Sequence, residues 1–148
     1  MNLRKAVLLG LLAYAMSFAA SIIILLVLGV EPSNLQDIPT SAYIIGMLAS
    51  IAITIICCLW YFKKEKASAE DGFKVGIILV AVSFFVDSIF FGVNALTATG
   101  TKEILIQYYA NIYFWLTIVL VIITSAIIGH FKKKAVSVAK KTKRKKRR

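Results

Sequence analysis

The sequence has almost no charge inside its long apolar runs and few of the side chains that enzymes use. It contains 1 His, 2 Cys and 2 Pro. It carries no His-Glu-x-x-His sequence, no glycine-rich phosphate loop and no Ser-His-Asp set with a credible base. A single histidine makes general acid–base catalysis difficult to arrange. We therefore expect a protein that is not an enzyme and that holds no cofactor and no metal.

The two cysteines, Cys57 and Cys58, are neighbours inside one apolar run, and no Cys-x-x-Cys sequence occurs. Adjacent cysteines rarely pair with each other, and a free cysteine usually behaves as a small apolar residue. We expect both to fill space between helices and to take no part in redox or metal chemistry.

Apolar residues are abundant instead. They make up 59% of the chain, and the mean hydropathy is +0.82. They gather in four runs that cover residues 6–30, 42–62, 75–96 and 106–131. A helix rises about 1.5 Å per residue and the hydrocarbon layer is about 30 Å thick, so each run is long enough to cross it.

These runs lack the alternation of polar and apolar residues that marks barrel strands. In lipid, only helices and closed barrels provide hydrogen-bond partners for all backbone N–H and C=O groups, so helices remain. The sequence therefore predicts an all-α polytopic membrane protein. Residues 1–134 form its transmembrane domain, with four helices in an antiparallel bundle. The start of the fourth helix falls anywhere from residue 106 to residue 112.

The placement of basic residues predicts the orientation. Of 18 Lys and Arg residues, all except Lys102 lie before the first run, between the second and third runs, or after the fourth. Cytoplasmic loops of membrane proteins carry an excess of Lys and Arg. We expect a multi-pass protein of the cytoplasmic (plasma) membrane with both the N-terminus and the C-terminus inside.

The C-terminal segment is a strongly basic tail. Residues 132–148 carry eleven basic and no acidic residues, which equals the net charge of +11. Residues 135–148 are too charged to fold alone, so we expect a disordered cytoplasmic tail. Each basic residue near anionic inner-leaflet lipids contributes about 1 kcal/mol of binding. The predicted headgroup contacts are Lys140, Lys141, Lys143, Arg144, Lys145, Lys146, Arg147 and Arg148.

Two other interpretations of the tail remain open. It is as well explained by a plain topology anchor as by lipid binding. Contact with nucleic acid or the ribosome, through the tail only, is a further alternative.

Each run carries a stripe of small and hydroxyl residues on one helical face, spaced 3 or 4 apart in the first three runs. Small residues and hydrogen bonds bring helices together in lipid, so we expect the stripes to face inward and form a polar layer at mid-membrane. Thr117 reaches this layer only if the fourth helix begins early in its run. We expect the hydroxyls to serve packing or to bond to backbone carbonyls of their own helices. The candidate site comprises Asp87, Ser83, Asn94, Ser17, Tyr14, Ser50, Thr54, Tyr113 and Thr117.

Asp87 is the only charged residue inside any of the four runs. An ionised carboxylate at the bilayer centre costs at least ~2.5–3.5 kcal/mol, and no run offers a Lys or Arg partner. A neutral Asp87 bonded to hydroxyls and an ionised Asp87 both remain open. The leading hypothesis is a structural or accessory membrane subunit, in a homo-oligomer or with a membrane-protein partner. The alternative is a small proton- or cation-coupled transporter that uses Asp87.

Sequence signals mark two helix ends. Ser68-Ala69-Glu70-Asp71 matches the capping box that precedes an apolar run, so the third helix is expected to begin a turn before the membrane. Pro32 is expected to end the first helix.

Several short motifs together resemble a group of short, four-span prokaryotic membrane proteins with no assigned function. They are Asn2-Leu3-Arg4-Lys5-Ala6, Tyr61-Phe62-Lys63, the acid Asp87, and Tyr108-Tyr109. The resemblance covers residues 1–134 and excludes the tail, and it implies an architecture but no activity. Small multidrug transporters also have four spans, but they keep their acid in the first span, which has none here.

Overall fold

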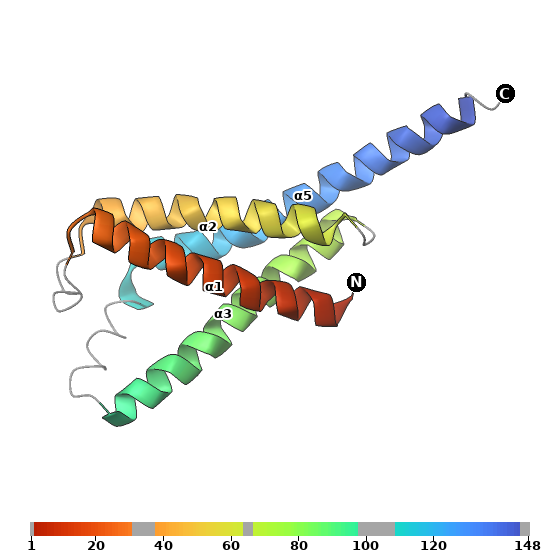
Figure 1. Ribbon diagram of the computed structural model, residues 1–148. Coiled ribbons are helices and arrows are strands. Elements are labelled where there is room, and N and C mark those ends of the chain that lie inside the picture. Colours follow the sequence, from red (N-terminus) through yellow and green to blue (C-terminus); the bar gives the residue numbers. More distant parts are fainter. Residues whose placement is uncertain (1, 31–37, 64–66, 98–108, 146–148) are drawn as a thin grey trace.

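The computed structural model is built from four long helices (Figure 1). It describes residues 2–30, 38–63, 67–97 and 109–145, with side chains for 2–30, 38–63, 67–90 and 109–133. The helices are α1 (Leu3–Val27), α2 (Thr40–Tyr61), α3 (Ala69–Thr97) and α5 (Ile112–Lys145). Each of the four is long and apolar enough to cross a membrane. The predicted all-helical class is confirmed for these residues, as are four helices with the length and composition of the predicted spans.

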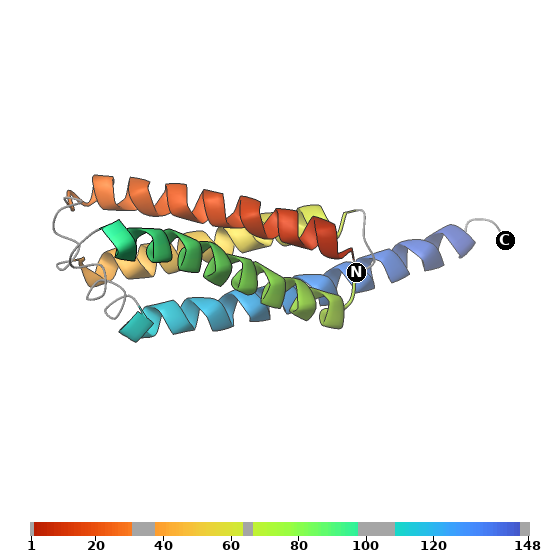
Figure 2. The same ribbon diagram turned by 90° about the horizontal axis from the view of Figure 1, so that it is seen from below.

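Each helix packs against two others, in the order α1, α2, α5, α3 around the bundle. In the contacts between α1 and α3, the residue numbers of both helices increase in the same direction, from Gly10 with Val82 to Phe18 with Phe90. The N-terminus and the end of α5 lie toward the same end of the bundle, and α5 extends beyond the other helices (Figure 1 and Figure 2).

Along α3 and α5 the contacting residues run in opposite order. Gly72 lies against Ser125, and Phe84 lies against Phe114. This order brings the beginning of α3 next to the later part of the apolar stretch of α5.

The outside of the bundle is covered by large apolar side chains. Phe85 is 67% exposed, Leu26 is 65% exposed and Trp60 is 64% exposed. Exposed apolar patches on water-soluble monomers are small, whereas here such residues occur along all four helices. This surface fits a hydrocarbon environment.

Among the described residues, the buried apolar cluster lies at one end of the bundle, the packed end. The buried cluster draws on the first turns of α1, the last turns of α2, the early part of α3 and Ile128 of α5. Its members include Ala6, Leu9, Tyr61, Val75 and Leu79.

Glycines allow α3 and α5 to approach closely at this packed end. A Cβ added to Gly72 would collide with the backbone carbonyl oxygen of Ser125, and one added to Gly129 would collide with that of Ser68. Gly72 and Gly76 have the Gly-x-x-x-Gly spacing that lets membrane helices meet backbone to backbone. The spacing of Gly72 and Gly76 is the sequence signal for this contact. The predicted polar stripe of the third run did not contain the two glycines as a pair.

The end of α1 differs from the prediction. The helix ends at Val27, before Pro32, because Gly29 takes a positive φ of 68°. The Gly29 amide donates to the carbonyl of Leu26 at 3.2 Å, and the Val30 amide donates to that of Leu25 at 3.0 Å. This pair of bonds is a Schellman motif, which closes a helix through a left-handed residue that glycine adopts without strain.

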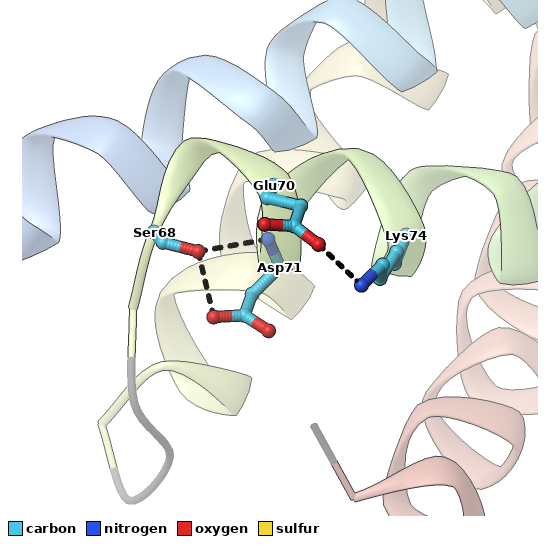
Figure 3. A network of polar contacts seen from close by, with 4 residues as sticks. All are labelled: Ser68, Glu70, Asp71 and Lys74. Carbon is cyan, nitrogen blue, oxygen red and sulfur yellow. Dashed lines mark hydrogen bonds and ion pairs between the residues drawn. The ribbon is translucent and has the colours of Figure 1, made fainter.

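The start of α3 confirms the predicted capping signal (Figure 3). The Oγ of Ser68 accepts a hydrogen bond from the Asp71 amide at 3.0 Å and donates one to Asp71 Oδ2 at 2.7 Å. One turn further on, Lys74 pairs with Glu70 on the exposed side. The helix therefore begins at Ala69, ahead of the predicted span at residues 75–96.

Replacing Ser68 with alanine is expected to cost about 1 kcal/mol, because the Asp71 amide loses its side-chain acceptor. Hydrogen exchange of the protein in lipid nanodiscs should then be about five-fold faster at the first amides of α3. The control is Ser88→Ala, since Ser88 is exposed and its hydroxyl bonds only to the carbonyl of Phe84 in the same helix. Unchanged exchange in Ser68→Ala would contradict the capping role.

The fourth helix starts late in its predicted range and ends late too. Asn111 caps it, with Oδ1 accepting from the Tyr113 amide at 2.9 Å and the backbone oxygen accepting from the Phe114 amide at 3.1 Å. Helix α5 then continues to Lys145, past the predicted boundary at residue 134. The expected disordered tail, residues 135–148, is thus helical as far as Lys145. Lys, Arg and Ala are good helix formers, and extending an existing helix needs no new nucleus.

Candidate functional site

A cavity of about 370 Å³ lies inside the bundle, beyond the packed end. All four helices contribute to its walls. Of the predicted site residues, those that line it are Tyr14, Ser17, Ser50, Thr54, Ser83, Asp87, Tyr113 and Thr117. Asn94 lies outside the residues whose side chains the structure describes. Four separate stripes in the sequence therefore meet around one space.

Asp87 is partly buried in the cavity wall, where α3 faces α1. The hydroxyl of Tyr14 donates a hydrogen bond to Asp87 Oδ1 at 2.7 Å. The acid is therefore bonded to a hydroxyl. Within the described part of the chain, Oδ2 has no hydrogen-bond partner and no basic side chain pairs with the carboxyl group. Oδ1 of Asp87 is thus held by Tyr14, while Oδ2 is available to bind a ligand in the cavity.

The smaller hydroxyls of the site bond to their own helices. Thr54 donates to the carbonyl of Ser50 at 2.8 Å, Ser83 to that of Leu79 at 3.0 Å, and Thr117 to that of Tyr113 at 2.7 Å. The predicted backbone bonding is confirmed for these three residues. Because each proton is engaged, these hydroxyls offer only acceptor lone pairs to a ligand.

Aromatic rings form the remaining walls. Tyr43 of α2 stacks on Tyr113 of α5, with ring centroids 6.1 Å apart and planes 9° apart. Phe84 of α3 meets Phe114 of α5 edge to face at 5.6 Å. Together with Tyr14 of α1, every helix supplies at least one ring.

Some lining residues were not predicted: Phe18, Tyr43, Phe84, Asn111 and Phe114. Tyr43 belongs to the polar stripe of the second run, and Phe18, Phe84 and Phe114 each follow a predicted residue directly in the sequence. A cavity between four helices is lined by a wider part of each helix than a single stripe of residues. The neighbours of stripe residues therefore face it as well, which stripe positions alone do not indicate.

Thr117 lines the cavity although the fourth helix starts late. Helix α5 begins at Ile112, the late limit of the predicted range, and Thr117 still lines the cavity. The register of α5 is fixed by its packing on α2, through the Tyr43–Tyr113 pair and a contact of Cys58 with Ser125. The depth of the site in the membrane stays a prediction.

The cysteines lie in the packed end, away from the cavity's acid. Cys57 and Cys58 are free and buried, and Cys58 Sγ donates to the Oγ of Ser125 at 3.4 Å. Both belong to the buried apolar cluster, as expected for packing residues. Among the described residues, no group of three or more His, Cys, Asp and Glu side chains could hold a metal ion.

Five of the eight predicted headgroup-binding residues lie at the far end of α5. The helical backbone includes Lys140, Lys141, Lys143, Arg144 and Lys145. Lys146, Arg147 and Arg148 lie outside the described residues.

No protein-family model, no curated protein and no solved structure matches the chain. The case for a function therefore rests on Asp87 and the cavity around it.

Proposed function

We propose that this is a non-enzymatic, multi-pass protein of the cytoplasmic membrane that carries a proton or another monovalent cation at Asp87. One observation carries the proposal. The only acid within the four apolar runs faces a cavity shared by all four helices, with one carboxyl oxygen held by Tyr14. Placing an ionisable side chain inside a membrane costs free energy. Such residues are rare there and commonly mark ion pathways and proton relays.

The position of Asp87 favours transport over a purely structural role. An acid that serves only to fasten helices is best placed in a closely packed contact, with both oxygens bonded across it. The close contact in this chain lies elsewhere, at Gly72, Gly76 and Gly129. Asp87 instead lines open space, where a proton or cation can reach it.

The proposed orientation follows from charge. The basic residues support an antiparallel bundle with both termini in the cytoplasm. The packed end then faces the cytoplasm and the cavity extends toward the outside. A site that is packed on one side and extends toward the other is compatible with one half of an alternating-access cycle.

A structural or accessory subunit is the second candidate, and one contact favours it. The Tyr14–Asp87 hydrogen bond joins α1 to α3, which also touch at Gly10 and Val82. In this candidate a neutral Asp87 stabilises the bundle, and the exposed apolar faces bind a second copy or another membrane protein.

The basic end of α5 has a separate proposed role. Its Lys and Arg residues follow directly after a membrane span, which supports contact with anionic inner-leaflet lipids. Binding of nucleic acid or the ribosome is the alternative for this segment.

Flux measurements on Asp87→Asn test the transport proposal. The purified chain is reconstituted in vesicles that contain a pH-sensitive dye, and gradients of Na⁺, K⁺ and benzyltrimethylammonium are imposed in turn. Asparagine keeps a hydrogen-bonding side chain of the same size but does not ionise. We expect at least one gradient to drive proton movement in the wild type, and we expect Asp87→Asn to reduce it to the level of empty vesicles.

Ser88→Ala is the matched control, because Ser88 is the next residue of α3 and is exposed on the outside. It should retain wild-type flux. If Asp87→Asn assembles normally and moves protons as the wild type does, or if no gradient moves protons in the wild type, proton movement at Asp87, alone or in exchange for these cations, is ruled out. The structural candidate then takes its place.

A further inference from the structure

The size of the cavity bears on what it holds. A volume of about 370 Å³ falls within the roughly 300–1,000 Å³ of pockets that bind small molecules. It is more than ten times the ~30 Å³ that one water takes in the liquid. A proton or a bare metal ion needs no such space, whereas an organic molecule with several carbon atoms does.

The chemistry of the walls points to an organic cation. Metal ions such as Ca²⁺ and Mg²⁺ need about six or more converging oxygen ligands. In the described part of the chain, the cavity wall contains one carboxyl group, and no group of three or more His, Cys, Asp and Glu side chains could hold a metal ion. A single carboxylate is a weak ligand set for a metal ion that must give up its hydration shell.

Aromatic rings supply the second attraction for an organic cation. The face of an aromatic ring is negative and attracts ammonium groups, most strongly in sites shielded from water. Tyr43 and Tyr113 form a stacked pair across α2 and α5, and Phe84 with Phe114 forms a second group across α3 and α5. Asp87 adds a full counter-charge, with Oδ2 unbonded in the described structure.

From these three features we infer that the cavity binds a monovalent organic cation, of the substituted-ammonium class, with an apolar body. The cationic group lies between Asp87 and the rings of Tyr43 and Tyr113, and the apolar body lies against Phe84. The inference rests on the proposed cation-carrying function and specifies the class of cation.

Binding of benzyltrimethylammonium tests the inference directly. The full chain in lipid nanodiscs is titrated by calorimetry, with the signal of empty nanodiscs subtracted. We expect saturable binding to the wild type that excess NaCl or KCl does not abolish. Asp87→Asn should weaken binding at least ten-fold. Tyr113→Leu should weaken it by about 2- to 30-fold, the range for loss of one cation–π contact.

Phe85→Leu is the control for the loss of a ring. Phe85 neighbours Phe84 in α3, but it is 67% exposed on the outside and does not line the cavity. It should bind the probe as the wild type does. Tyr43→Leu is the second aromatic variant and serves if Tyr113→Leu fails to assemble.

Two results would overturn the inference. One is the absence of saturable binding to a wild-type protein that still shows Asp87-dependent proton flux with Na⁺ or K⁺, in which case the proposed transport stands and only the class of cation is wrong. The other is binding that is equal in wild type, Asp87→Asn and both aromatic variants, which would place the probe outside this cavity. Asp87-dependent binding without any flux would leave the site intact and reject transport instead.

Discussion

Alanine at Gly72 is expected to separate α3 from α5 and so to destabilise the whole bundle. The added Cβ would meet the backbone carbonyl of Ser125 and would lie 2.9 Å from the Cα of Ala126. Backbone atoms cannot rotate away as a side chain does, so the two helices must move apart. Overpacking of this kind costs about 1–3 kcal/mol or more, which exceeds the roughly 1 kcal/mol that alanine gains over glycine in a helix.

The measurement is an SDS titration of the purified protein in mixed micelles, followed by tryptophan fluorescence. Gly72→Ala should unfold at a clearly lower SDS fraction than the wild type. Gly46→Ala is the matched control, because a Cβ at Gly46 meets no atom within 4 Å. It should be as stable as the wild type or more stable. If Gly72→Ala unfolds at the wild-type SDS fraction, the close contact between α3 and α5 does not hold the bundle together.

Phenylalanine at Gly46 is expected to abolish cation flux without weakening the fold. Gly46 lines the cavity and has open space in the direction of a side chain. A benzyl group placed there occupies room that a ligand needs, on the same helix as Tyr43. Removing a glycine from a helix interior also favours the helical state by several tenths of a kcal/mol, or about 0.5.

Vesicle flux and the SDS titration, made on the same preparation, test this prediction. Gly46→Phe should show the flux of empty vesicles and an unfolding midpoint at or above that of the wild type. Leu48→Phe provides the control, since Leu48 lies two residues further along α2 and is 58% exposed on the outside. It should retain flux. Normal flux through Gly46→Phe would mean that the cavity is not on the transport path.

Much of this architecture was readable in the sequence because lipid imposes simple rules on a chain. Runs of about 20 apolar residues must become helices in a membrane, and the structure has four such helices. The start of α3 could also be predicted from local sequence, since Ser68 and Asp71 lie three residues apart and form hydrogen bonds with each other. The predicted end of α1 at Pro32 was wrong, because Gly29 adopts the left-handed conformation and ends the helix earlier in the chain.

The candidate site was partly readable for a related reason. A polar residue within an apolar run must find a partner, so Asp87 and the hydroxyl stripes marked the inward faces of their helices. What spacing along one helix cannot supply is the register between helices. The bond from Tyr14 to Asp87 joins residues 73 positions apart, and no periodicity connects them.

The sequence by itself indicated four apolar helices long enough to span a membrane, which the described residues form, and showed that the acid lies inside one of the apolar runs. Only the tertiary structure decided that the same acid faces a shared aromatic cavity rather than a packed contact. The physical reason is that glycines bring α3 and α5 together at one end of the bundle. Beyond that end, larger side chains such as Tyr43, Phe84 and Tyr113 hold the helices around open space. The balance between close approach and separation depends on which residues meet across helices, and that is a property of the assembled bundle.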